Sequence, residues 1–166
     1  MTSERNGTIT NLPDGRPRLE FRRSWPDPIE DVWSALTEPD RMARWLGVYE
    51  GDRRSGGRGT FTMTQEEQAV GEPMTILECE PPRRLVVEWQ SEMEWRVELD
   101  LAVEGAETAL RLTQAFAAGT DVADVATGWH WYLDKLDAEV GGGAPPAGWD
   151  AFLAEVGPAY ASRPAG

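Results

Sequence analysis

Residues 28–46 read PIEDVWSALTEPDRMARWL and predict two short helices with a sharp break between them. The apolar residues of the first helix recur at helical spacing: Ile29, Val32, Trp33 and Leu36. Pro39 ends that helix, because the residue before a proline is pushed out of the α region. Met42, Trp45 and Leu46 then share one side of the second helix. Neither helix is long enough to be stable alone in water, so both must pack against a larger structure.

The composition of the chain limits its function classes. It has 166 residues, enough for one domain with its own hydrophobic core. The formal net charge is -13, and such an acidic surface repels phosphate backbones and anionic lipids, so nucleic acid and membrane partners are not expected.

Cys79 is the only cysteine, which excludes a cysteine-based metal site and suits a reducing compartment. We find no signal-peptide pattern and no apolar run of about 18 residues, so we expect a cytoplasmic protein.

Alternation of apolar and polar residues predicts a sheet. The clearest strand is residues 94–103, in which the apolar positions are Trp95, Val97, Leu99, Leu101 and Val103. Further strands are expected at residues 16–25, 47–52, 60–64, 71–80, 83–90 and 108–116. One apolar and one wet face is typical of an antiparallel sheet, and strands that follow one another in the chain usually pair. We therefore expect a curved antiparallel sheet of about six or seven strands.

A long amphipathic helix is predicted after the last strand. Its apolar residues between Asp121 and Val140 fall within one arc, and the glycines at 141–143 end it. It is the only predicted element large enough to cover the apolar face of the sheet. The expected fold is therefore α+β, a helix-grip in which the curved sheet wraps around the long C-terminal helix. The two short helices follow the first strand.

Three segments are expected along the chain. Residues 1–15 are polar and are predicted to form a flexible N-terminal arm. Residues 16–140 are predicted to form the helix-grip domain. Residues 141–166 are predicted to form a proline-containing linker followed by a short terminal helix.

Several short motifs spread over residues 16–140 carry a family resemblance. They comprise Arg23, Val32, Trp33, Leu36, Thr37, Pro39, Trp45, Leu46, Gly59, Phe61, Glu80, Pro81, Pro82, Arg83, Arg84, Leu85, Val86, Trp89, Thr108, Leu110, Leu112, Gly128, Trp129, Leu133 and Leu136. With these residues the chain resembles the START-like, or SRPBCC, superfamily, and within it bacterial homologues of the activator of heat shock protein 90 ATPase. The resemblance implies a helix-grip fold. Members of this superfamily include carriers of hydrophobic ligands, polyketide aromatases and cyclases, and co-chaperone domains. The resemblance therefore implies a hydrophobic small-molecule ligand, such an enzymatic activity, or a chaperone partner with a role in the stress response.

A cavity is expected because a curved sheet and one helix rarely close tightly. Our leading hypothesis is that the protein binds a hydrophobic small molecule between the sheet and the long helix, without a catalytic centre or a cofactor. The residues predicted to line this cavity are Trp33, Phe61, Trp89, Trp95, Leu112, Gln114, Phe116, Trp129 and Leu133. Arg23 also faces inward, where a buried arginine needs a carboxylate or an anionic ligand. Pairing with a nearby Glu, or an outward bend at a bulge, is favoured over an anionic ligand.

Candidate catalytic groups are few. His130 is the only histidine and falls at the edge of the buried helix face, where a structural role is favoured over that of a general base. Cys79 lies between Glu78 and Glu80, whose charges disfavour its thiolate, so an inert thiol is expected. Most other carboxylates alternate with apolar residues and are expected on the wet face of the sheet. We therefore favour binding over catalysis.

Two alternative functions stay open. The first is a polyketide aromatase or cyclase, in which His130 or Tyr132 would reach the cavity as the acid-base group. Relatives in the resembled family often carry a histidine where this chain has Gln114, so that position also bears on this alternative. The second is an interaction protein, either a chaperone regulator or a homodimer, that uses apolar surface around Trp131 and the terminal helix.

Overall fold

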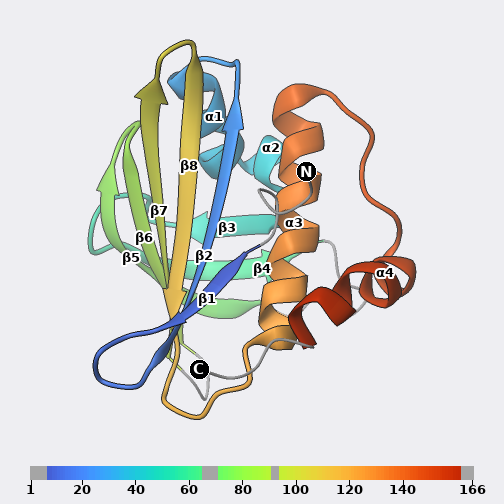
Figure 1. Ribbon diagram of the computed structural model, residues 1–166. Coiled ribbons are helices and arrows are strands. Elements are labelled where there is room, and N and C mark those ends of the chain that lie inside the picture. The colour runs from blue at the N-terminus through green and yellow to red at the C-terminus, as the bar shows by residue number, and fades with distance from the viewer. Residues whose placement is uncertain (1–6, 65–70, 91–93, 162–166) are drawn as a thin grey trace.

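The computed structural model describes residues 7–64, 71–90 and 94–161. Within these residues the chain forms eight strands and four helices (Figure 1). The strands are β1 (Thr8–Asn11), β2 (Pro17–Trp25), β3 (Gly47–Gly51), β4 (Arg58–Met63), β5 (Glu72–Glu80), β6 (Arg84–Gln90), β7 (Glu94–Glu104) and β8 (Glu107–Ala115). The helices are α1 (Ile29–Thr37), α2 (Pro39–Met42), α3 (Ala123–Gly141) and α4 (Trp149–Ala161).

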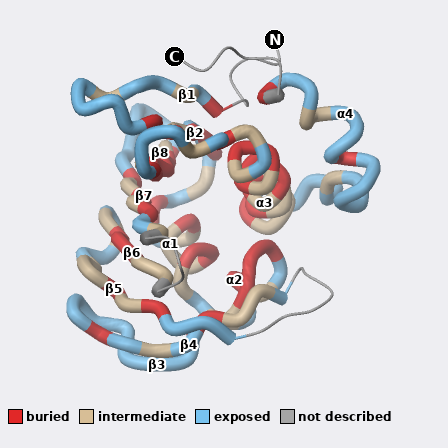
Figure 2. The backbone as a smooth tube through the Cα atoms, turned by 90° about the horizontal axis from the view of Figure 1, so that it is seen from below, coloured by how far each residue is buried: buried red, intermediate tan, exposed pale blue. Residues whose placement is uncertain are grey.

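All eight strands belong to one antiparallel sheet in the order β1-β2-β8-β7-β6-β5-β4-β3. From β3 to β8, each strand pairs with its neighbour in sequence. The step from β2 to β3 is different, because these strands lie near opposite ends of the sheet. The helices α1 and α2 form this connection. The sheet curves around α1 and α3 (Figure 2), which confirms the predicted α+β helix-grip fold.

The sheet has one strand more than the six or seven predicted. The additional strand is β1, which lies in the segment predicted to be a flexible arm. Ile9 stands opposite Leu19 of β2 and packs against the core, and the β-branched run Thr8, Ile9 and Thr10 favours an extended conformation. Residues 1–6 of the predicted arm and 162–166 of the predicted tail lie outside the described residues. The division of the chain at residues 15 and 140 stays a prediction.

The long helix α3 has the sheet on one side and α4 on the other (Figures 1 and 2). It ends where Gly142 adopts a left-handed conformation, with φ of 75°. Trp131 faces away from the sheet, and its indole N–H donates to the carbonyl of Ala147 at 2.9 Å. Its ring lies 5.2 Å from that of Trp149. The C-terminal segment of the same chain therefore covers Trp131, while Trp149 and Leu153 of α4 stay exposed, so the interaction hypothesis stays a prediction.

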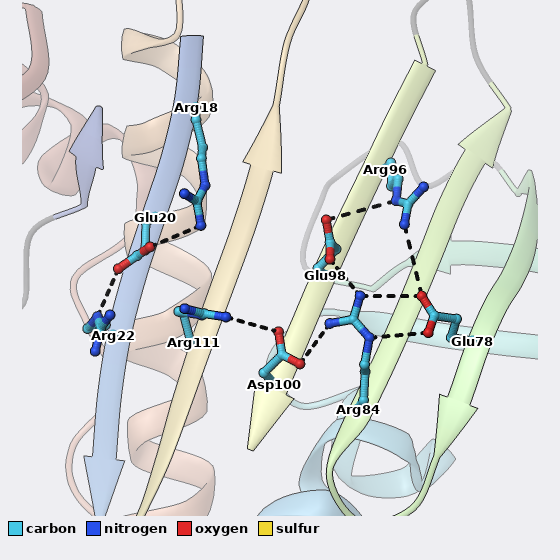
Figure 3. Close-up of polar contacts among 9 residues, drawn as sticks. All are labelled: Arg18, Glu20, Arg22, Glu78, Arg84, Arg96, Glu98, Asp100 and Arg111. Atoms are coloured by element: carbon cyan, nitrogen blue, oxygen red, sulfur yellow. Dashed lines mark hydrogen bonds and ion pairs between the residues drawn. The ribbon is translucent and has the colours of Figure 1, made fainter. Parts of the chain in front are cut away.

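Charged residues form ion pairs on the solvent face of the sheet (Figure 3). Arg84 of β6 donates to the carboxylates of Glu98 and Asp100 on β7, at 2.7 Å each. It also contacts Glu78 on β5 at 3.3 Å. These three carboxylates, led by Glu78, raise the pKa of Arg84. The three carboxylates thus bond to arginine on the solvent face of the sheet, where the alternation of polar and apolar residues predicted them.

Candidate functional site

A cavity of about 250 Å³ lies on the concave side of the sheet, over the part formed by β3 to β7. The helices α1 and α2 with the turn after them form its opposite wall. Its lining residues are Trp33, Leu36, Thr37, Met42, Trp45, Leu46, Tyr49, Arg53, Phe61, Met74, Ile76, Cys79, Pro81, Leu85, Val87, Trp89, Val97, Leu99 and Trp129. Only one of these, Trp129, belongs to α3. The cavity is therefore enclosed mainly by the sheet and the short helix pair, and less by the long helix than the sequence predicted.

The strand pattern explains the sheet wall. Val87 of β6 stands opposite Ile76 of β5 and Val97 of β7, and residues directly opposite in antiparallel strands share a face. Their inward position follows from the two-residue period that predicted these strands. Phe61 meets Trp89 edge to face with ring centroids 5.3 Å apart, which closes the apolar wall towards β4.

The helix pair supplies the other wall. Leu36 and Met42 are buried, and Trp33 is half-buried. Trp45 is almost wholly buried, and its indole N–H donates to the carbonyl of Ala35 at 2.7 Å. Because Ala35 lies in the last turn of α1, this bond satisfies a carbonyl that has no partner within the helix. The stretch that predicts the fold thus also builds the cavity.

Several polar side chains on the cavity wall are engaged within the protein. The hydroxyl of Tyr49 donates to the carbonyl of Asp52 at 2.7 Å, and that of Thr37 donates to the carbonyl of Trp33 at 2.8 Å. The indole N–H of Trp129 donates to Gln114 at 2.9 Å. Burial is the main cause that raises the pKa of Tyr49. Arg53 is the one charged residue among the described residues that line the cavity.

Four of the nine residues predicted to line a cavity do so, namely Trp33, Phe61, Trp89 and Trp129. The other five face the interior without reaching this cavity: Trp95, Leu112, Gln114, Phe116 and Leu133. The reason is that α3 packs against the part of the sheet near β2, and side chains fill the space there. Gln114 contributes indirectly, through its bond to Trp129.

Most residues that line the cavity were not among the nine predicted, and those that are polar or lie outside regular periodicity include Tyr49, Arg53, Cys79 and Pro81. The apolar period of β3 could have indicated Tyr49. Arg53 lies in a glycine-rich connector without periodicity, so no pattern indicated which way its side chain points. Cys79 follows a register shift in β5 between Ile76 and Glu78, which breaks the alternation on which the prediction depended.

The groups required by the aromatase hypothesis do not line the cavity. His130 is buried between α3 and α4, and its Nδ1 lies 2.8 Å from the hydroxyl of Tyr160. Its ring also contacts Phe21 and Phe152 edge to face. Tyr132 packs against Trp129 and is likewise not among the lining residues. His130 therefore links α3 to α4 and is not among the residues that line this cavity.

Arg23 has carboxylate partners on α3. Its guanidinium donates to Asp134 at 2.9 Å and to Asp137 at 2.6 Å. The indole N–H of Trp25 adds a bond to Asp137 at 3.0 Å. The prediction that Arg23 pairs with a carboxylate is therefore confirmed, but the predicted residue type was wrong. The acceptors are two aspartates of α3 and not a glutamate. Arg23 thus joins β2 to α3 and does not line the cavity.

The described residues contain no group of three or more His, Cys, Asp or Glu side chains placed to hold a metal ion. None of the helices in those residues has the length and apolar character needed to cross a bilayer.

Cys79 provides a chemical probe of the cavity wall. Burial raises the pKa of its thiol, so a smaller fraction is thiolate near neutral pH, and we expect iodoacetamide to alkylate it several-fold more slowly than in the urea-unfolded chain. The folded protein should also need a higher pH for half-maximal reactivity. Mass spectrometry can follow the reaction without ambiguity, since the chain has one cysteine. Equal rates for the folded and unfolded chains would contradict this prediction.

Comparison with known proteins gives a family match over most of the chain. Residues 27–141 match the family model described as Activator of Hsp90 ATPase homolog 1-like protein. The matched range contains every residue that lines the cavity. No curated protein sequence matches the chain.

Solved structures share the architecture. The crystal structure of CalU16 from Micromonospora echinospora is 31% identical in sequence, with a TM-score of 0.72, over 94% of this chain and 94% of that chain. The protein encoded by gene BPP1335 from Bordetella parapertussis is 29% identical, with a TM-score of 0.74, over 96% of this chain and 91% of that chain. DynU16, a protein of the dynemicin biosynthetic locus, is 24% identical with a TM-score of 0.63, over 77% of this chain and 48% of that chain. This last likeness shows the fold alone.

Proposed function

Because the chain belongs to the family of Activator of Hsp90 ATPase homolog 1-like proteins, within the START-like (SRPBCC) superfamily, we propose that it binds a compact hydrophobic small molecule in the cavity beneath α1 and α2. The observation that carries this proposal is the lining itself, which is apolar and aromatic along both walls. Ligand sites are typically concave, mostly apolar and equipped with a few polar groups. The cavity has each of these properties.

The size of the cavity narrows the proposal to small ligands. Its volume of about 250 Å³ is just below the range of roughly 300–1,000 Å³ typical of sites for drug-sized molecules. Four indole rings stand on its wall, from Trp33, Trp45, Trp89 and Trp129. Rings of this size offer large flat contact areas, which favour a planar or aromatic ligand body. His130 and Tyr132 lie outside this cavity, so the proposal gives them no part in ligand binding.

The test uses N-phenylnaphthylamine, a neutral probe that fluoresces in apolar surroundings, and a substitution that fills the cavity. Val87→Phe places a larger side chain on the cavity wall, and we expect it to weaken probe binding about tenfold or more, equivalent to about 1.4 kcal/mol. Val103→Phe is the matched control, because Val103 lies on the same sheet and is 56% exposed. It should leave the affinity unchanged.

A second cavity-filling variant keeps the test valid if Val87→Phe does not fold. Cys79→Phe adds bulk at a half-buried lining position, where a larger side chain is easier to accommodate. Circular dichroism must show that each variant is folded before the titrations are compared. Absence of probe binding by the unmodified protein, or equal binding by all folded variants, would overturn the proposal.

A further inference from the structure

Arg53 has no carboxylate partner among the residues that the structure describes. In the parts of the chain that the structure describes, no Asp or Glu side chain lies within ion-pair distance of its guanidinium, although the protein has a net charge of -13. The adjacent Arg54 pairs with Asp52 at 2.7 Å, so the one acidic residue of this connector is engaged elsewhere. Within the described part of the chain, Arg53 is thus a cation without an ion pair at the edge of an apolar cavity.

The connector that carries Arg53 is held against the sheet. The N–H of Gly56 donates to the carbonyl of Ile76 at 2.7 Å, and the N–H of Ile76 donates to the carbonyl of Gly57 at 2.8 Å. The hydroxyl of Ser55 accepts from the N–H of Cys79 at 2.9 Å. A side chain at Gly57 would collide with the carbonyl of Asp52, so this turn is also closely packed. These contacts fix the backbone that positions Arg53.

The remaining polar chemistry of the cavity favours a ligand that accepts hydrogen bonds. Among the described residues that line it, none is Asp, Glu, Asn or Gln. The hydroxyl protons of Thr37 and Tyr49 are donated to backbone carbonyls, and the indole protons of Trp45 and Trp129 are also donated within the protein. A cationic ligand would be repelled by Arg53, because no acidic residue among the described lining could balance the ligand's charge. An anionic group would gain a charge-assisted bond there.

We propose that the ligand of this cavity is a hydrophobic carboxylate, with its apolar body between the sheet and the helix pair and its carboxylate on Arg53. This inference rests on the proposed binding function and specifies its ligand class. The guanidinium suits a carboxylate because its planar fork can donate two parallel hydrogen bonds. Because the rest of the protein is acidic, the preference for an anion must come from this site and not from a general attraction.

The experiment compares two ligands of the same shape, naphthylacetate and its neutral amide, naphthylacetamide, by calorimetric or NMR titration. We expect the unmodified protein to bind the acid about fivefold to tenfold more tightly than the amide, a range consistent with one charge-assisted hydrogen-bond site that is partly exposed to solvent. Arg53→Gln should remove this preference by weakening only the acid. Raising the salt concentration should reduce the preference in the unmodified protein.

Arg58→Gln is the matched control, because it removes the same charge from an exposed neighbour that does not line the cavity. It should keep the preference for the acid. If both naphthyl ligands bind equally well to the unmodified protein, or if Arg53→Gln and Arg58→Gln act alike, the carboxylate inference is overturned while hydrophobic binding stands. If neither these ligands nor N-phenylnaphthylamine binds, the proposed function itself fails.

Discussion

Replacing Arg23 with methionine is expected to lower the free energy of unfolding by about 3–5 kcal/mol, measured by urea denaturation near neutral pH. The side chain of Arg23 is only 4% exposed and bonds to Asp134 and Asp137, which are 16% and 19% exposed. Its loss would remove the guanidinium that bonds to both of these largely buried carboxylates. That penalty exceeds the loss of the arginine contacts themselves, because a largely buried carboxylate that loses its charge-assisted bonds is costly.

A variant that also neutralises Asp134 and Asp137 distinguishes the cost of the buried carboxylate charges from the cost of lost arginine packing. Adding Asp134→Asn and Asp137→Asn to Arg23→Met removes both carboxylate charges that the arginine had balanced, so the triple variant should recover a large part of the lost stability. Arg22→Ala is the matched control on the same strand, where the side chain is 69% exposed, and no measurable change is expected. A triple variant less stable than Arg23→Met would show that the charges are not the main cause.

The fold was predictable because its main signals are local and periodic. The alternation of residues 94–103 indicated a half-buried strand, and the arc of apolar residues in α3 indicated the helix that packs against it. The strand β1 was missed because its four residues carry too short a pattern to distinguish a strand from an arm. Its pairing with β2 depends on the curved sheet already being in place, which is a tertiary effect.

The site was predictable only in part, because periodicity shows which side chains point inward and not which part of the interior they fill. Leu112 and Val97 share the inner face of neighbouring strands, yet only Val97 reaches the cavity. The difference arises from the position of α3, which the sequence did not specify. Arg53 could not be predicted as a cavity residue for another reason. Its position depends on hydrogen bonds from a turn-rich connector to β5, and such connectors have no repeating sequence pattern.

The cavity and the stability of the domain depend on the same helix pair. Trp45→Ala is expected to lower the free energy of unfolding by about 3–5 kcal/mol, the usual cost of deleting a large aromatic side chain from a core. Trp45 is 1% exposed, so the substitution both removes a buried ring and enlarges the cavity. Trp149→Ala is the matched control at 37% exposure, and it should cost less than about 1 kcal/mol. Urea denaturation of both variants gives the comparison.

Trp45→Phe separates the hydrogen bond from the ring. Phenylalanine keeps most of the apolar volume but leaves the carbonyl of Ala35 without its indole donor, and an unsatisfied buried acceptor costs about 1–3 kcal/mol. We therefore expect its stability to fall between those of the unmodified protein and Trp45→Ala. A Trp45→Phe variant as stable as the unmodified protein would contradict a capping role for the indole. Because this bond fixes the end of α1 next to the cavity, Trp45→Phe should also weaken binding of N-phenylnaphthylamine, whereas Trp149→Ala should not.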